Sequence, residues 1–374
     1  MSTPPVSEGE VRTALHQVID PELRRPIDEL GMLQSVMVDG ARVAVRVLLT
    51  IAGCPLRGTI EGDVRAALAG VRGVEDIVVE LDVMSPQQRQ ELRERLRPER
   101  GIPFSRPGSL TKVYAVASGK GGVGKSSVTV NLACELASRG LRVGIVDADV
   151  HGFSVPGLLG ASGTPTQVDD MILPPVAHGV KVISIGMFVK GNRPVAWRGP
   201  MLHRALEQFL GDVFFGDLDV LFLDLPPGTG DVAISVSQLL PNAELLVVTT
   251  PQAAAAEVAE RAGSVSAQTG QKVAGVIENM SGLTLPDGTV MEIFGSGGGQ
   301  RVAARLTEVL GAPVEVLGQV PLDVALREGG DAGLPIVLGR PDSPAATVLR
   351  SIADRLAARP RGLAGRSLGV APAL

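Results

Sequence analysis

The chain has 374 residues, of which 45% are hydrophobic and 20% charged, a balance typical of a globular protein with two domains. Its 35 basic and 40 acidic residues leave a net charge of −5, which argues against nucleic-acid binding, because that usually needs a basic face. Only two cysteines are present, which excludes a disulfide framework and a four-cysteine metal site within one chain. With no bilayer-length apolar run and no secretory signal, we expect a cytoplasmic protein that does not enter a membrane.

Residues 1–84 are expected to form a small α+β domain. Apolar residues recur at helical spacing over 11–18, and a hairpin is predicted around the turn Asp39-Gly40. A helix over 56–71 and a closing strand over 74–81 complete the unit.

A charged, Pro-containing linker follows at 85–111, and its first half is predicted to be a solvent-exposed helix.

From 112 to 358, short apolar strands alternate with helical segments, which predicts an α/β domain with a mostly parallel sheet covered by helices. Residues 359–374 are expected to form a flexible tail. The predicted strands are VYAVA (113–117), RVGIVDAD (142–149), VKVISIG (180–186), VLFLDL (220–225), LLVVTT (245–250), VAGVIEN (273–279) and VEVLGQV (314–320).

The strongest motif is GKGGVGKS at 119–126, which fits G-x-x-x-x-G-K-[ST] between a predicted strand and a predicted helix. Its glycines let several backbone N–H groups face one anion, and the helix N-terminus adds its positive end. Lys125 is expected to reach the outer phosphates of a nucleotide, Ser126 to bind Mg²⁺ and Ser127 to bond an inner phosphate. The predicted phosphate-binding residues are Gly119, Lys120, Gly121, Gly122, Val123, Gly124, Lys125, Ser126 and Ser127.

Acidic residues end two of the predicted strands, where α/β sheets place their ligands. Asp149 is expected to orient or activate the attacking water, at the start of a loop that we call the first switch. Asp147 is assigned to the Mg²⁺ shell, or alternatively to a helix cap, and Asp224 to holding Mg²⁺ through water. The second switch is the segment 226–231, in which Asp231 is more simply an N-cap. With Lys120 and Lys125, these carboxylates predict slow, switch-type ATP hydrolysis.

Lys120 is an additional lysine inside the loop, and the resulting G-K-G-G-x-G-K-[ST] resembles the deviant Walker A motif of the MinD/ParA/Mrp branch of P-loop proteins. In that branch the extra lysine reaches the nucleotide of a partner subunit. The resemblance therefore implies a homodimer that encloses ATP, whereas the residues alone also allow Lys120 to be a solvated loop lysine.

Seven segments together resemble the Mrp/ApbC family of iron–sulfur cluster carriers, over residues 112–358. The resemblance implies a MinD-like P-loop fold, homodimerisation, modest ATPase activity, and delivery of iron–sulfur clusters to apoproteins alongside assembly factors. It also implies that Asn279 bonds the adenine edge and that the loop at Pro321 packs against the base. The segments are SGKGGVGKSS (118–127), VDADVHGFSVPGLLG (146–160), WRGPM (197–201), LDLPPGTGDVA (223–233), VTTPQ (248–252), ENMSG (278–282) and QVPLD (319–323).

The N-terminal segments DPELRRPIDELGM (20–32) and LLTIAGCPL (48–56) resemble the iron–sulfur assembly domain of the PaaD/SufT type, whose Thr-x-x-x-Cys-Pro matches residues 50–55. Many carriers also have a C-x-x-C after the ENMS segment that holds a bridging [4Fe–4S] cluster. Here no cysteine lies between Gly282 and Phe294, and a hairpin turn is expected at 286–288.

The two cysteines are assigned different roles. Cys54 is the candidate cluster ligand, since it precedes a predicted helix whose N-terminus would lower its pKa, although a small apolar loop residue is an equal interpretation. Cys134 is expected to be structural and buried.

Two alternatives stay open. The first is a MinD/ParA-like spatial or partitioning ATPase, which the C-terminal residues disfavour because Pro and three Gly make a poor amphipathic membrane helix. The second is an ATP-dependent assembly scaffold that holds no cluster itself.

Overall fold

The computed structural model describes residues 6–358 except 52–53, 55, 97–100, 107, 150–151, 169–170, 189–198, 229–230, 253–260, 262–265 and 286. The predicted tail at 359–374 lies outside the described residues, as do parts of the two predicted switches. The chain divides into two compact units. The first contains Met1–Arg100 with two later segments, Gly163–Pro175 and Asp212–Gly216, and the second contains the remainder.

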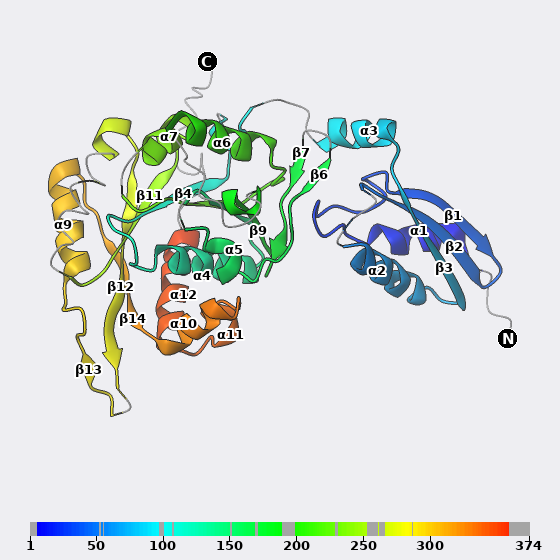
Figure 1. The fold of residues 1–374 in the computed structure, drawn as a ribbon. Helices are drawn as coiled ribbons and strands as arrows, with labels where there is room; N and C mark the ends of the chain where they lie inside the picture. Colours follow the sequence, from blue (N-terminus) through cyan, green and yellow to red (C-terminus); the bar gives the residue numbers. More distant parts are fainter. Residues whose placement is uncertain are drawn as a thin grey trace, which may run out of the picture. The chain divides into compact units, whose positions relative to one another are not determined.

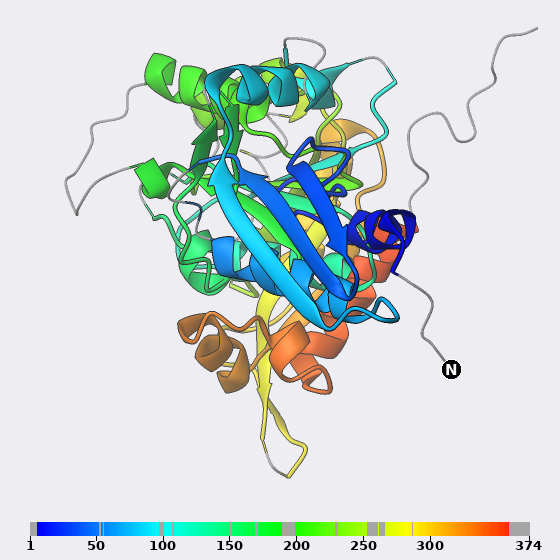
Figure 2. The ribbon, with the colours of Figure 1, turned by 90° about the vertical axis from the view of Figure 1, so that its right-hand side faces the viewer.

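The first unit is built on a three-stranded sheet in the order β1-β2-β3 (Figure 2). β1 and β2 form the predicted hairpin, with Asp39 opposite Arg42, and β3 returns parallel to β2 through α2. Its elements are α1 (Glu8–His16), β1 (Leu33–Asp39), β2 (Arg42–Leu49), α2 (Arg57–Ala69), β3 (Asp76–Val83) and α3 (Pro86–Leu96). The prediction of a fully solvated helix in the linker is wrong at one position, because Leu92 of α3 is buried in the core of this unit.

A hairpin from much later in the chain completes this core. β6 (Thr166–Val168) and β7 (Met171–Leu173) pair antiparallel. Val168, Met171 and Leu173 are each 1% exposed and pack in one cluster with residues of α1, β2 and α2. The sequence predicts this stretch as part of the α/β domain, and that boundary is wrong. The hairpin joins the first unit through packing between residues that are far apart in the chain, which local patterns do not encode.

The second unit has a nine-stranded sheet in the order β13-β12-β11-β4-β10-β5-β9-β8, with β14 beside β12 (Figure 1). All seven predicted strands are present, the five central pairings are parallel, and the α/β fold is confirmed. Short antiparallel strands close the two edges. The strands are β4 (Lys112–Ala117), β5 (Val143–Asp147), β8 (Val176–Ala177), β9 (Val180–Ser184), β10 (Val220–Asp224), β11 (Glu244–Thr249), β12 (Val273–Thr284), β13 (Val290–Met291) and β14 (Val316–Leu322).

Helices cover both faces of this sheet, with α4 and α12 on one side and α6 and α7 on the other (Figure 1). The helices are α4 (Lys125–Ser138), α5 (Val155–Leu158), α6 (Gly199–Asp212), α7 (Asp231–Leu239), α9 (Gly298–Leu310), α10 (Val324–Asp331), α11 (Ile336–Gly339) and α12 (Pro344–Ala357), with short 3₁₀ turns at Pro103–Ser105 and Ile185–Phe188. No helix in the part of the chain that the structure describes combines the length and apolar character that a bilayer crossing requires.

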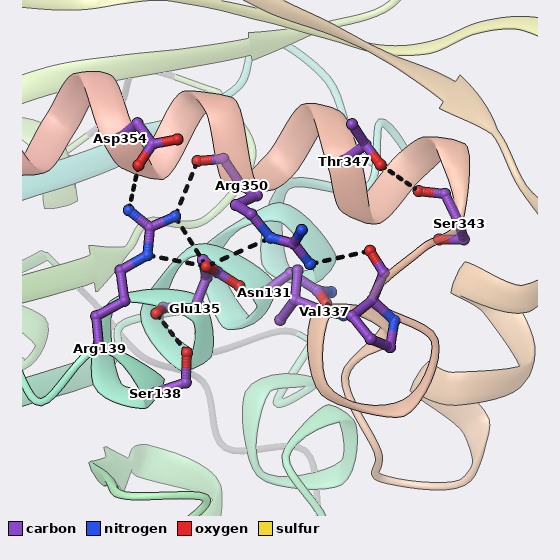
Figure 3. A network of polar contacts seen from close by, with 10 residues as sticks. Asn131, Glu135, Ser138, Arg139, Val337, Ser343, Thr347, Arg350 and Asp354 are labelled. Carbon is purple, nitrogen blue, oxygen red and sulfur yellow. Dashed lines mark hydrogen bonds and ion pairs between the residues drawn. The ribbon is translucent and has the colours of Figure 1, made fainter.

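Polar contacts fix α4 to the C-terminal helices (Figure 3). The carboxylate of Glu135 pairs with Arg139 on its own helix and with Arg350 on α12. Arg139 also pairs with Asp354, and the side chain of Asn131 accepts the N–H of Val337 from α11. Because α4 follows the phosphate-binding motif directly, these contacts hold the loop's C-terminal end in place.

Candidate functional site

The predicted phosphate loop lies between β4 and α4, as the motif requires. Gly122 and Gly124 both have φ of +78°, a left-handed conformation that is costly for residues with a side chain. Gly124 is the N-cap of α4, so the helix and the positive end of its dipole begin at the motif lysine. The loop is also tied to the second switch, because the N–H of Gly228 donates to the carbonyl of Ser118 at 2.8 Å.

Asp224, at the end of β10, is the centre of the site. It is fully buried and accepts from Lys125 Nζ at 2.6 Å, Ser126 Oγ at 2.5 Å and Thr129 Oγ1 at 2.8 Å. Thr129 has no role in the sequence-based prediction, although it lies four residues after Lys125 and so on the same helix face. The structure therefore brings the predicted lysine, serine and aspartate together.

Asp147 lies beside Asp224 on the neighbouring strand, in direct register. Its oxygens accept from Ser184 Oγ at 2.9 Å and from the N–H of Asp149 at 3.2 Å. Burial, and then the charge of Asp224, raise the pKa of Asp147 to about 7. Two buried carboxylates with a serine hydroxyl are hard oxygen donors of the kind that Mg²⁺ prefers.

A magnesium ion here would need ligands from outside the chain. Within the described residues, no three His, Cys, Asp or Glu side chains form a metal-binding group. Because Mg²⁺ in nucleotide sites usually keeps waters and binds phosphate oxygens, one or two carboxylates from the protein are sufficient. Asp147, Asp224 and Ser126 fit that requirement.

Asn279, on β12, contacts the phosphate loop. Its Nδ2 donates to the carbonyl of Val123 at 2.9 Å, and a Cβ on Gly124 would lie 2.3 Å from that nitrogen, so only glycine fits there. Its Oδ1 is buried and has no hydrogen-bond partner in the described structure. Asn279 is paired with Val320 of β14, which precedes Pro321.

A second acceptor of this kind is Asp323, just after β14, to which the sequence patterns assign no role. Its Oδ1 caps α10 by accepting the N–H of Ala325 at 2.9 Å, and its Oδ2 is buried without a partner. Among the described residues, Asn279 and Asp323 are the two that leave a buried side-chain oxygen unsatisfied. Such atoms are costly unless a ligand or water meets them.

The remaining predicted residues lie on the same loops. The exposed Lys120 donates a hydrogen bond from Nζ to the side chain of Gln252, in the VTTPQ segment. Asp149 is 9% exposed and lies two residues after the end of β5. The carbonyl of Ser127 accepts from Asn131 Nδ2 at 2.8 Å, which stiffens the first turns of α4.

Cys54 belongs to the first unit, whereas the phosphate loop belongs to the second. The half-buried Cys54 packs against the core of its unit. Burial, followed by the charges of Glu22 and Asp20, raises its pKa, and these outweigh the N–H of Leu56, which lowers it. The prediction of a lowered Cys54 pKa is therefore wrong. Cys134, by contrast, is fully buried, as predicted, and burial raises its pKa to about 12.

The segment without the C-x-x-C forms the predicted hairpin. β12 continues to Thr284, and the turn is closed by the N–H of Leu285 donating to the carbonyl of Thr289 at 2.8 Å. This hairpin extends away from the rest of the second unit (Figure 1). Val290, Met291 and Ile293 on its return are 49–58% exposed. This hairpin, residues 282–294, is called the arm below, and it presents apolar side chains and no thiol.

The chain is similar to known proteins over most of its length. Residues 109–357 match the family model described as NUBPL iron-transfer P-loop NTPase, and residues 8–81 match the iron-sulfur cluster assembly protein model. The chain is 64% identical to the iron-sulfur cluster carrier protein of Mycobacterium tuberculosis, covering 97% of this chain and 96% of that protein. It is 39% identical to the Bacillus subtilis protein of that name, covering 85% and 88%. A solved nucleotide-binding protein in complex with ADP from Archaeoglobus fulgidus is 33% identical with a TM-score of 0.50, covering 67% of this chain and 91% of that one.

The raised pKa of Asp147 predicts a pH dependence of stability. Its pKa of about 7 compares with 3.8 in the unfolded chain, so at intermediate pH the folded protein holds a proton that the unfolded chain has lost, and stability falls as pH rises. Without Mg²⁺ and nucleotide, we expect this group to lower the free energy of unfolding by about 2 kcal/mol between pH 5.5 and 8.5. Urea denaturation across this range should show the slope in the wild type and lose it in Asp147→Asn. Asp217→Asn, with a side chain that is 90% exposed, is the matched control, and an unchanged slope in Asp147→Asn would contradict the assignment.

Proposed function

Because this chain belongs to the NUBPL iron-transfer P-loop NTPase family and carries an iron–sulfur cluster assembly domain, we propose that it is a slow, Mg²⁺-dependent ATPase that transfers iron–sulfur clusters to apoproteins. The observation that carries the ATPase is the convergence of Lys125, Ser126 and Thr129 on Asp224, beside Asp147. The cargo is supported by relatives named iron-sulfur cluster carrier protein, which match 97% and 85% of this chain.

The residues around the phosphate loop divide the work of phosphoryl transfer. The loop N–H groups and Lys125 bind the phosphates, and Ser126, Asp224 and Asp147 would hold Mg²⁺, which neutralises phosphate charge. The ammonium group of Lys125 forms an ion pair with Asp224. Phosphate oxygens of the nucleotide would replace that carboxylate as its partner. Asp149 orients the attacking water. None of these groups forms a covalent intermediate, as expected for chemistry that depends on position and charge.

We further propose that the protein acts as a cytoplasmic homodimer with assembly factors and apoproteins as partners. Lys120 would reach the nucleotide of the partner subunit. Within one chain it is exposed and donates a hydrogen bond to Gln252. An exposed contact of this kind contributes little free energy, so Lys120 can leave Gln252 and bind the nucleotide instead.

We propose that Asn279 and Asp323 select adenine. Asn279 lies within β12, Asp323 directly follows the adjacent β14, and each leaves a buried acceptor unpaired. An adenine amino group is a donor and would satisfy such acceptors, whereas the guanine carbonyl at the same position would face them as another acceptor. A site whose buried polar groups stay unpaired with the wrong ligand discriminates strongly against it.

Cluster handling is assigned to Cys54, since the arm at 282–294 lacks cysteine. A dimer would supply two such thiols, which is fewer than a closed tetrathiolate site needs, so the cluster would be held transiently with ligands from other molecules. Because the Cys54 pKa is raised, binding must release its proton, and cluster uptake should improve with rising pH.

An assembly scaffold that holds no cluster is the second candidate, favoured by the same protonated thiol. The iron-transfer family match favours either over a spatial or partitioning ATPase.

Substituting the phosphate-loop lysine tests the ATPase. Lys125→Ala is expected to lower kcat/KM for ATP by about 100-fold or more, because it removes a charge that stabilises the transferring phosphoryl group. Lys272→Ala, an exposed lysine at the start of β12, should leave turnover unchanged. The measurement is phosphate release at saturating Mg²⁺. Wild-type turnover in Lys125→Ala would show that the observed phosphate release does not come from this phosphate loop. The assembly scaffold would then be the remaining candidate function.

Base selection is tested at Asp323. Asp323→Asn can keep the helix-capping oxygen while placing an amide donor where the unpaired acceptor was, so the ratio of kcat/KM for ATP over GTP is expected to fall about 10-fold. Asp331→Asn, on the exposed face of the same helix, is the control. An unchanged ratio in Asp323→Asn would remove Asp323 from base recognition.

The cluster role is tested by anaerobic reconstitution with iron, sulfide and an added low-molecular-weight thiol, which supplies the ligands that two Cys54 thiols do not. Wild type should retain stoichiometric iron and acid-labile sulfide per dimer, Cys54→Ser should lose both, and Cys134→Ala should retain both because that thiol is buried and structural. If wild type and Cys54→Ser both lack cluster, the protein is an ATP-driven assembly scaffold rather than a carrier.

A further inference from the structure

Glu278 precedes Asn279 in β12 and is a fully buried carboxylate. Its Oε1 accepts from Ser281 Oγ at 2.6 Å and from Gln319 Nε2 on β14 at 2.8 Å. Its Oε2 accepts the N–H of Gly299, in the first turn of α9, at 2.5 Å. A buried carboxylate is tolerated when donors of this kind satisfy its oxygens. Glu278 therefore fixes one point of β12 to both β14 and α9.

The fit between Glu278 and α9 is close. A Cβ on Gly299 would lie 2.9 Å from Glu278 Cβ and 3.2 Å from its Oε2. A Cβ on Gly298 would lie 2.1 Å from the carbonyl oxygen of Thr250, which directly follows β11. Only glycine allows the backbone of the helix to approach its neighbours this closely. The first turn of α9 is thus packed against β12 and the end of β11, where it holds the Glu278 side chain in place.

Just after Glu278, β12 leaves its regular pairing with β14. Asn279 is opposite Val320 and Leu283 is opposite Leu322, so four steps along β12 match only two along β14. Met280 lies in this bulge with a φ of +61°, a left-handed conformation that is strained for a residue with a side chain. Bulges next to functional sites commonly redirect a side chain.

The bulge brings two consecutive side chains to the phosphate loop. In a regular strand, Asn279 and Met280 would point to opposite faces. Here the position that a Cβ on Gly124 would occupy lies 2.3 Å from Asn279 Nδ2 and 3.8 Å from Met280 Cε. Asn279 Nδ2 also donates to the carbonyl of Val123. The left-handed turn at Met280 therefore lets both side chains reach the same part of the loop.

The hydrogen bond from Ser281 to Glu278 closes this turn, because it joins the residues on either side of Asn279 and Met280. A strained residue persists only where the surrounding structure holds it. Since Glu278 is itself fixed to β14 and α9, it is a firm partner for the Ser281 hydroxyl.

We propose that Glu278 and Ser281 are positioning residues for nucleotide binding. Their hydrogen bond holds Met280 in its left-handed conformation and so keeps Asn279 and Met280 on the phosphate loop. Neither Glu278 nor Ser281 has to touch the nucleotide for this effect. The inference rests on the proposed nucleotide function, but it does not depend on which base is bound.

The test is the affinity of the full-length protein for Mg²⁺-ADP, measured by isothermal titration calorimetry, together with kcat and KM for ATP. Ser281→Ala is expected to weaken Mg²⁺-ADP binding about 5- to 10-fold, the scale of one lost hydrogen bond. KM for ATP should rise while kcat changes less than about 2-fold, because the lost contact acts on binding rather than on phosphoryl transfer. Ser281→Thr keeps the hydroxyl and should bind as wild type does. Glu278→Gln, which puts an amide donor among the donors that face Glu278, should also weaken binding.

A double substitution tests whether Ser281 acts through the turn. Glycine adopts a left-handed conformation at little cost, so in a Met280→Gly background the turn no longer depends on Ser281. Adding Ser281→Ala to Met280→Gly should therefore weaken Mg²⁺-ADP binding less than about 2-fold. The same loss in both backgrounds would show that Ser281 does not act by holding Met280, and would overturn the proposal.

Thr307→Val is the matched control. Its hydroxyl also ties α9 to its surroundings, since it donates to the carbonyl of Ala303 and accepts the N–H of Val314, both at 2.9 Å. It lies near the opposite end of the helix from Gly299, so Thr307→Val should lower thermal stability without changing nucleotide affinity. If circular dichroism shows that Ser281→Ala does not fold, Glu278→Gln takes its place.

The outcomes separate this inference from the proposed function. Wild-type affinity for Mg²⁺-ADP in Ser281→Ala overturns the positioning role and leaves the ATPase intact. Failure of the wild type to bind Mg²⁺-ADP defeats both. Equal weakening of Mg²⁺-ADP and Mg²⁺-GDP binding by Ser281→Ala supports the positioning role and counts only against adenine selection by Asn279.

Discussion

The buried carboxylate of Asp224 is the contact on which the nucleotide site depends. It ends a central strand and draws three side chains from the first turns of α4 to one point. A buried charge is tolerated only when it is paired and hydrogen-bonded, so this arrangement fixes the strand, the loop and the helix together. The adjacent Asp147 cannot be paired in the same way, and the Asp224 charge is one cause of its raised pKa. The two neighbouring buried carboxylates therefore repel each other, and a divalent cation bound by both would offset that repulsion.

The parts of this protein that follow local rules could be predicted from its sequence. The buried strands have continuous apolar runs, and the phosphate loop has a fixed spacing of glycines and lysine, so the residue patterns alone locate both. Thr129 and Asp323 escape such prediction for different reasons. Thr129 could have been found from its spacing to Lys125 on a helix, whereas the unpaired oxygen of Asp323 depends on which atoms surround it after folding.

Two errors concern Cys54 and its surroundings, and both come from long-range packing. The sequence places Cys54 before a helix, which alone would lower its pKa. Folding brings Asp20 and Glu22 from a loop more than 30 residues earlier, and burial with their charges reverses the direction. Likewise, no local pattern assigns β6 and β7 to the first unit, because only the completed core shows that Met171 and Leu173 belong to it.

The division of Cys54 and the phosphate loop between two units constrains how ATP could serve cluster transfer. The arm at 282–294 is continuous with the strand that carries Asn279 and has no cysteine, so the thiol assigned to cluster handling belongs to the other unit. Any coupling between the two sites is reciprocal: if ATP changes the affinity of the first unit for a cluster, then the cluster must change the affinity for ATP by the same factor.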